Sequence, residues 1–138
     1  MDKPTLDLDS RVIDFIKSNV KLPVPVEMGR QDRSGPAIVY VMEPTNEVHR
    51  YFNGRLKRAY AFTLMAKVER WTDATSLLDQ INQLMEDAKP SDIKSSNGSF
   101  QYITAVMTAS PSYRDAVEDD GVTYSVYAAS FKVTIIIN

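Results

Sequence analysis

The sequence predicts an α+β fold, an antiparallel β-sheet with two α-helices packed on it. Two segments place apolar side chains at the spacing of an amphipathic helix, and six others alternate or are rich in β-branched residues. Strands that follow one another along a chain tend to pair antiparallel, and amphipathic helices need a sheet face to cover. The expected order is α-β-β-β-β-α-β-β. We expect one domain over residues 1–138, because this length can bury a core and no repeat or linker divides it.

The first helix is expected over residues 10–19, where apolar side chains share one stripe. Asp9 or Ser10 is expected to cap its start by accepting a hydrogen bond from a free backbone N–H. Pro23 and Pro25 require the helix to stop, because the residue before a proline avoids helical geometry. The stripe consists of Val12, Ile13, Ile16 and Val20.

Two strands, a loop and a turn are expected between the first helix and the clearest hairpin signal. Residues 24–28 predict an edge strand, because Pro25 cannot donate to a ladder. A polar loop is expected over residues 29–36. The β-branched run 37–42 is typical of a strand buried on both faces. Residues 43–46, Glu-Pro-Thr-Asn, predict a turn.

The sequence Asn53-Gly54 predicts a hairpin tip, because Asn-Gly readily adopts the two positive φ values of a type I′ turn. Tyr51 and Phe52 are expected to pair across this hairpin. Residues 60–68 then alternate as a strand with one face on the core. The expected core face consists of Tyr60, Phe62, Leu64, Ala66 and Val68.

The second helix is expected to start at Trp71-Thr72-Asp73, with Thr72 or Asp73 as its cap, and to end at Lys89-Pro90. Trp71 is expected to lie in the core rather than at an interface. Apolar side chains keep helical spacing throughout this segment. They are Ala74, Leu77, Leu78, Ile81, Leu84, Met85 and Ala88.

The C-terminal part predicts two strands, residues 100–108 and 122–137. Residues 91–98 are expected to form a polar loop, and residues 109–121 a long acidic connection. In the last strand the apolar positions change parity. A bulge near Ala129-Ser130 would return them to a single face.

The sequence contains no workable set of catalytic or metal-binding residues. Cysteine is absent, and the single histidine, His49, lies between Val48 and Arg50 in an expected hairpin arm, which favours a surface position. The acidic run at residues 118–121 lacks the ligand spacing of a calcium loop. Phosphate-binding loops and nucleophile elbows have no matching motif. We expect no enzyme activity, no metal and no bound cofactor.

Basic and acidic residues are segregated, although the net charge is only −2. Residues 48–68 contain no acid, and residues 115–120 contain four acids and no base. Opposite patches on one molecule suit a head-to-tail contact, which closes into a ring when the rotation permits. The expected inter-subunit contacts join Arg55, Lys57 and Arg58 to Asp115, Glu118, Asp119 and Asp120 of the next subunit.

No secretory signal and no apolar run of membrane-spanning length occurs, so we expect a cytoplasmic setting and no membrane partner. The basic hairpin, with Tyr51 and Phe52 as stacking residues, leaves open a nucleic-acid-binding module. The negative net charge argues against that use.

The chain resembles the tail terminator proteins of long-tailed bacteriophages, in particular the group from phages of Gram-positive bacteria labelled minor capsid proteins. The resemblance covers nearly the whole chain and lies in element order and general pattern. It involves the N-terminal helix, the hairpin at Tyr51-Phe52-Asn53-Gly54, the strand over residues 60–68, Trp71 leading into Thr75-Ser76-Leu77-Leu78-Asp79-Gln80-Ile81, and the closing pair of strands.

The resemblance implies a homo-oligomeric ring, commonly of six subunits, that caps a completed tail tube. It implies that the ring stops tube polymerisation, contacts the tail tube protein, and joins the tail to the head connector. DNA would pass through the lumen without specific binding. The implied location is the tail–head junction of a virion assembled in the host cytoplasm. Another neck or head–tail joining protein, and a small-molecule-binding α+β domain, are the alternatives.

Overall fold

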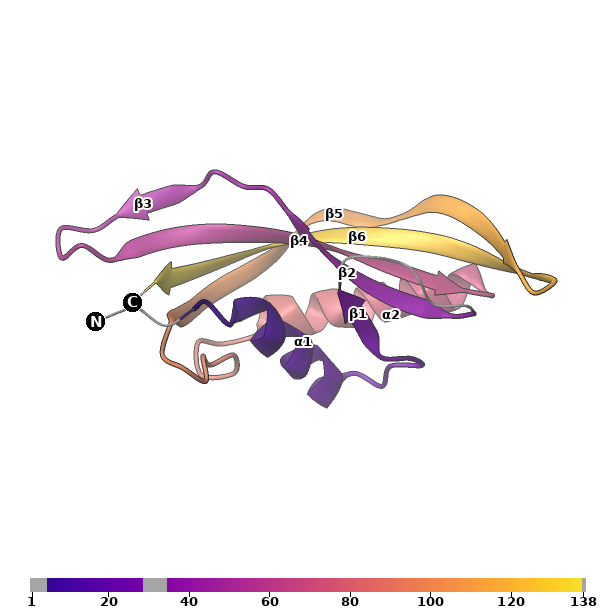
Figure 1. Ribbon diagram of the computed structural model, residues 1–138, viewed down its shortest axis with the longest axis horizontal. Helices are drawn as coiled ribbons and strands as arrows, with labels where there is room; N and C mark the ends of the chain where they lie inside the picture. The colour runs from indigo at the N-terminus through magenta and orange to yellow at the C-terminus, as the bar shows by residue number, and fades with distance from the viewer. Residues whose placement is uncertain (1–4, 29–34, 138) are drawn as a thin grey trace.

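The computed structural model describes residues 5–28 and 35–137 (Figure 1). The element order predicted from the sequence is confirmed in this part of the chain, while most of the predicted loop over residues 29–36 lies outside it. The elements are α1 (Leu8–Asn19), β1 (Val26–Met28), β2 (Ala37–Glu43), β3 (Val48–Arg50), β4 (Leu56–Val68), α2 (Trp71–Asp87), β5 (Phe100–Asp119) and β6 (Val122–Ile137).

The strands form one six-stranded sheet with the order β1-β2-β4-β6-β5. β3 pairs with β4 beyond the end of β2, so β2 and β3 share one edge of β4. All pairs are antiparallel except β1 with β2, which is parallel over three residue pairs. The antiparallel prediction therefore holds for the sheet as a whole and fails at its short edge strand.

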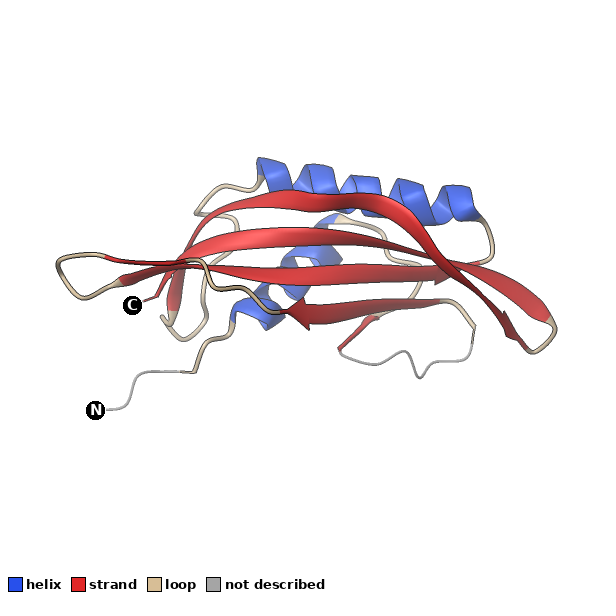
Figure 2. Cartoon of the chain, turned by 90° about the horizontal axis from the view of Figure 1, so that it is seen from above, coloured by secondary structure: helices blue, strands red, loops and turns tan. Residues whose placement is uncertain are grey.

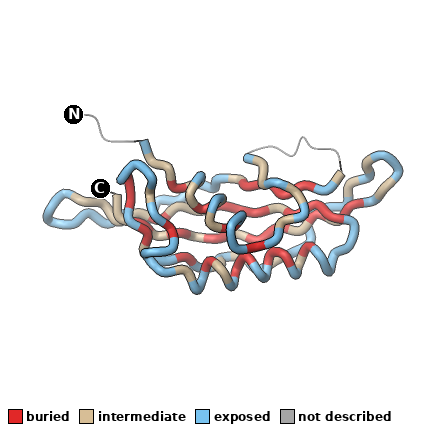
Figure 3. The backbone as a smooth tube through the Cα atoms, turned by 90° about the horizontal axis from the view of Figure 1, so that it is seen from below, coloured by how far each residue is buried: buried red, intermediate tan, exposed pale blue. Residues whose placement is uncertain are grey.

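Both helices lie on one face of the sheet, and no helix of the described residues lies on the other face (Figures 1 and 2). The helix stripes and the facing strand positions are buried together (Figure 3). At the centre of this core Phe62 stacks on Tyr40 and on Phe131, with ring centroids 4.5 and 5.2 Å apart. Burial, and then the neighbouring Asp9 carboxylate, raise the pKa of Tyr40. The Tyr40 hydroxyl donates a hydrogen bond to Asp9.

Both helix caps differ from the prediction. α1 begins two residues earlier than expected, after Asp7, and α2 begins after Arg70; neither residue caps its helix with a side-chain hydrogen bond. Asp9 cannot act as the cap because it lies inside α1 and accepts the Tyr40 hydroxyl. Thr72 and Asp73 lie in the first turn of α2. The predicted stripe of α2 is buried at Ala74, Leu77, Leu78, Ile81 and Met85, while Leu84 and Ala88 are half-buried and Asn82, which was not predicted, is buried.

The acidic connection predicted over residues 109–121 is wrong, because β5 continues to Asp119. It pairs with β6 along this length, with register shifts that interrupt the ladder. A polar strand was missed because most of residues 108–120 are exposed, so no apolar alternation marks them. Asp120 and Gly121, with φ values of 51° and 79°, form the two-residue turn. Both central residues have positive φ, as a type I′ turn requires.

The bulge predicted near Ala129-Ser130 is also wrong. The pairing of β4 with β6 is unbroken, and the irregularities lie in β5 instead. The apolar positions of β6 change parity because each face of the strand is buried along part of its length. Ala129 and Phe131 face the helices, whereas Val126 pairs with Lys67 on the helix-free face.

The hairpin at Asn53-Gly54 is confirmed, but its turn type is not. Only Gly54 has a positive φ, of 87°. The Gly54 N–H donates to the Tyr51 carbonyl, and the Tyr51 N–H donates to the Arg55 carbonyl. This is a three-residue loop in which a tight turn is followed by a left-handed glycine.

Candidate functional site

The β3–β4 hairpin forms a basic end of the molecule (left in Figure 1). Arg50 reaches across the loop toward the Gly54 carbonyl, 3.4 Å away, and Arg55 donates to the Gln101 side chain at 3.2 Å. Lys57 pairs with His49 across the two strands, and both line a recess on the sheet. The basic side chains are therefore held on a regular hairpin rather than on a free loop.

The three basic residues expected at one contact do not share one surface. Arg58 pairs with Ile135, which is buried beneath the helices, so Arg58 points to the helix side of the sheet. Lys57, the next residue, points to the other face. The Nε atom of Arg58 is buried and makes no hydrogen bond to any described residue.

The β5–β6 hairpin forms an acidic end (right in Figure 1). Its tip is anchored to the sheet by Asp119, which accepts hydrogen bonds from the Gly35 backbone N–H at 2.7 Å and from Lys67 Nζ at 3.2 Å. The Gly35 hydrogen bond, followed by Lys67, lowers the pKa of Asp119. Lys67 is 4% exposed and also lies over the Tyr124 ring. Asp119 therefore forms its hydrogen bonds and its ion pair within its own chain.

The other predicted acids at this end face solvent. Asp115, Glu118 and Asp120 are exposed, and Asp115 accepts only the backbone N–H of Ala116 among the contacts of the described residues. The charges of these three carboxylates are therefore exposed to solvent.

The two ends lie far apart in one molecule. β4 pairs with β6 from Leu56 opposite Ile137 to Val68 opposite Ser125. The basic hairpin extends from the first of these pairs, and the acidic turn extends from the last. The predicted basic and acidic residues therefore cannot meet within one chain.

Each end also exposes aromatic side chains. Phe52, at the tip of the basic hairpin, is fully exposed, so its predicted pairing across the hairpin is wrong. Tyr51 instead packs edge-on against His49, with centroids 5.1 Å apart. At the acidic end Trp71 and Tyr113 are each 58% exposed. The prediction that Trp71 lies in the core is wrong, because this first residue of α2 is more than half exposed.

An open recess of about 780 Å³ lies on the sheet beside the basic hairpin. Its walls come from β3, β4, β5, β6 and the segment before β3, and within it Lys132 pairs with Glu47 at 3.0 Å. Sequence reasoning missed this recess, because its residues are brought together only by the pairing of distant strands.

The described residues contain no cluster of candidate metal ligands, and their histidine lies at the surface. His49 is exposed and lies beside Tyr51, as predicted for a surface histidine. No cluster of three or more His, Asp or Glu side chains within residues 5–28 and 35–137 could hold a metal ion. Neither α1 nor α2 has the length and apolar character needed to cross a membrane, and these are the helices of the described segments.

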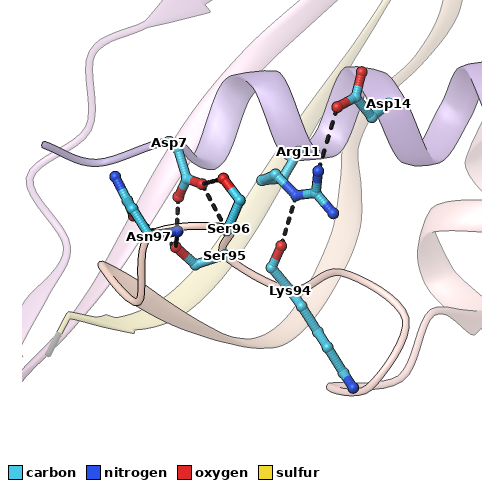
Figure 4. Close-up of polar contacts among 7 residues, drawn as sticks. All are labelled: Asp7, Arg11, Asp14, Lys94, Ser95, Ser96 and Asn97. Carbon is cyan, nitrogen blue, oxygen red and sulfur yellow. Dashed lines mark hydrogen bonds and ion pairs between the residues drawn. The ribbon is translucent and has the colours of Figure 1, made fainter. Parts of the chain in front are cut away.

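The N-terminal segment is fastened to the loop before β5 through the carboxylate of Asp7 (Figure 4). It accepts hydrogen bonds from the Ser95, Ser96 and Ser99 hydroxyls and from the Ser96 backbone N–H, at 2.7 to 2.9 Å. Burial raises the pKa of Asp7, but these hydrogen bonds outweigh burial and hold the pKa well below its ordinary value. Nearby, Arg11 Nε donates to the Lys94 carbonyl at 2.7 Å. This arrangement fastens the N-terminal segment to the loop before β5.

The sequence matches no protein-family model and no curated protein.

Proposed function

We propose that this chain is a structural virion protein that caps the tail tube of a long-tailed bacteriophage as a ring. In this role the ring stops tube polymerisation and joins the tail to the head connector. The proposal rests on the resemblance of the sequence and on one structural observation. Opposite charges lie at opposite ends of one long sheet, which suits repeated head-to-tail contacts between copies.

The charge arrangement supports a contact in which the basic hairpin of one copy meets the acidic hairpin of the next. Arg55 and Lys57 would face Asp115, Glu118 and Asp120 across this contact. Such complementarity steers association and sets its register more than it adds affinity. Arg58 and Asp119 belong to the same two ends, but Arg58 points to the helix side of the sheet and Asp119 is bonded to Gly35 and Lys67 of its own chain. The charge-reversal experiment therefore uses Arg55 and Lys57 with Glu118 and Asp120.

Reversal of Arg55 and Lys57 to glutamate is expected to impair ring formation at low salt. Reversal of Glu118 and Asp120 to lysine in the same chain is expected to restore it in part, because the contact regains opposite charges. The matched control reverses Lys17 and Lys21, which lie away from both ends. Oligomer size by analytical ultracentrifugation is the measurement. Normal assembly by the chain with the reversed hairpin would contradict the charge pairing.

The role in the virion is tested by tail length in phage that lack this protein. Tails of unregulated length are expected, because nothing would cap the tube. Tails of normal length that fail to join heads would instead favour a different neck protein, which is the alternative. Normal, joined tails would exclude both.

A further inference from the structure

The recess beside the basic hairpin lies on the helix-free face of the sheet. Ala59 of β4 and Thr134 of β6 pair with each other and both line it. Arg58 points to the helices, so Ala59, the next residue, points the other way. Thr104 of β5 lines one side, and the segment 46–51 lines the opposite side. The recess is therefore one continuous hollow that crosses β4 and β6 and is open to solvent.

The charged groups of this recess leave a net positive charge. Its lining contains two lysines, Lys57 and Lys132, and one acid, Glu47. Glu47 pairs with Lys132 at 3.0 Å, so the lining holds no further acid to balance Lys57. Arg55 donates to Gln101, which lies on the same side of the sheet as Lys57, and adds positive charge there. Tyrosine and threonine hydroxyls in the lining are additional hydrogen-bond donors. The recess suits an occupant that carries a carboxylate.

At the other end of the sheet the β5–β6 hairpin is a slender projection. Its ladder continues beyond Val68 and Ser125, where the pairing of β4 with β6 ends, to the Asp120-Gly121 turn. Paired strands lie only about 4.8 Å apart, so the tip is narrow. The hydrogen bonds of Asp119 hold this hairpin to the sheet. Little conformational freedom would therefore be lost when the tip binds a partner.

The outermost point of this hairpin carries negative charge. Asp120 is exposed in the turn, whereas Lys67 offsets the charge of Asp119. Burial, and then the charges of Glu69, Asp119 and Asp120, raise the pKa of Tyr124. The negative potential near the turn is thus strong enough to act on a side chain of the same molecule.

Two basic residues lie at this end but outside the turn. Arg70 directly precedes α2, which covers the helix side of the sheet, and Arg114 is on β5. At about 3.3 Å per residue, Arg114 is about 20 Å from Asp120 along the strand. Asp120 is therefore the charged group that the hairpin presents first when it approaches a partner end-on.

We infer that the Asp120-Gly121 turn of one copy inserts into the recess of the next copy, with the Asp120 carboxylate against Lys57. The recess volume of about 780 Å³ lies within the range of about 300–1,000 Å³ typical of sites that enclose a small ligand, and a two-residue turn is of similar size. Recess and turn lie at opposite ends of one sheet, so the same contact can repeat from copy to copy. This inference rests on the self-association in the proposed function and names the site that receives the acidic hairpin.

A neutral substitution that fills the recess separates insertion from attraction between charges. Thr104→Trp adds a large side chain at an exposed residue of the lining, and it is expected to weaken self-association on the order of tenfold. Thr108→Trp, at an exposed residue of the same strand outside the recess, is the matched control and should have no effect. Sedimentation velocity over a concentration series measures both. Normal self-association of Thr104→Trp would overturn the insertion, even where reversal of Arg55 and Lys57 impairs assembly.

Disulfide trapping identifies the two sides of the contact, because the natural chain has no cysteine. Val122→Cys, beside the turn, keeps Asp120 and is combined with Thr104→Cys, or with Thr108→Cys as the control. Thr104 pairs with Thr134, which is about 40 Å from Val122 along β6, so a disulfide within one chain is excluded.

Oxidation of the protein in a concentration series, and of purified tails that carry it, is expected to give a ladder of linked copies on a non-reducing gel. The ladder should appear with Thr104→Cys and not with Thr108→Cys. No ladder from the test pair, or an equal ladder from the control pair, would overturn the insertion.

The outcomes separate this inference from the proposed function. A ladder from the test pair together with normal tail length in phage lacking the protein keeps the insertion and rejects the role in tail termination. Unregulated tails without a ladder keep the role and reject the insertion.

Discussion

Lys67 and Asp119 are 52 residues apart in sequence, and their side chains meet at 3.2 Å on the helix-free face of the sheet. The same carboxylate accepts the backbone N–H of Gly35. One acid thus ties the end of β5 to β4 and to the residue that leads into β2. The sequence predicted an acidic loop in this region, whereas the structure has a hairpin that Asp119 holds to the sheet.

Asp119→Asn is expected to loosen this anchor, because the amide is a weaker acceptor for both the Lys67 ammonium and the Gly35 N–H. Hydrogen exchange at the Gly35 amide should become faster, and the thermal midpoint of unfolding should fall. Asp120→Asn, one residue further into the turn, is the control and should change neither quantity. Equal effects of the two substitutions would contradict the assigned role of Asp119.

Asp7→Asn is expected to destabilise the fold by about 1–2 kcal/mol at pH 7, the net scale of hydrogen bonds to a partly solvated charged group. Folding lowers the pKa of Asp7 from its ordinary value of 3.8. Its contribution is therefore fully present above the unfolded pKa and declines as the pH falls toward the lower folded pKa. Urea unfolding at pH 7 and pH 3 should show the difference between variant and parent shrinking at pH 3. A difference independent of pH would show that the carboxylate charge is not responsible. Asp14→Asn, in an exposed pair with Arg11, should have little effect at either pH.

Phe62→Ala is expected to cost about 3–5 kcal/mol of stability, because it empties a buried position between two stacked rings. Phe62 is 1% exposed and contacts Tyr40 and Phe131. Phe52→Ala removes the same atoms from an exposed hairpin tip and should change stability by about 0.5 kcal/mol or less. Chemical denaturation of the monomer measures both. A large loss for Phe52→Ala would mean that this side chain has a structural role in its own chain.

Arg58→Met is expected to leave the free energy of unfolding unchanged or to raise it. The buried Nε of Arg58 lacks a hydrogen-bond partner among the described residues, and methionine removes that cost of about 1–3 kcal/mol while filling similar space. Denaturant midpoints measure this effect, and a clear loss of stability would contradict it. Oligomer size of the same variant reports separately whether Arg58 contributes to the predicted contact between subunits.

The sequence by itself determined the order of helices and strands and the main core positions. The stripe of α2, the alternation over residues 60–68 and the hairpin at Asn53-Gly54 were read correctly because they depend on local periodicity and turn chemistry. The separation of basic residues in 48–68 from acidic residues in 115–120 was also evident from the sequence. The absence of cysteine and the single histidine limited the chemistry that could be expected.

Tertiary structure alone decided the features that depend on pairing between distant segments. Residues 109–119 form a strand because they pair with β6, although their polar sequence shows no apolar alternation. The change of parity in β6 reflects burial on both faces, which one-dimensional periodicity cannot distinguish from a bulge. Trp71 lies on the core stripe of α2 yet is exposed, because the exposure of the first residue of a helix depends on the segments packed around it and not on the helical spacing that the sequence shows.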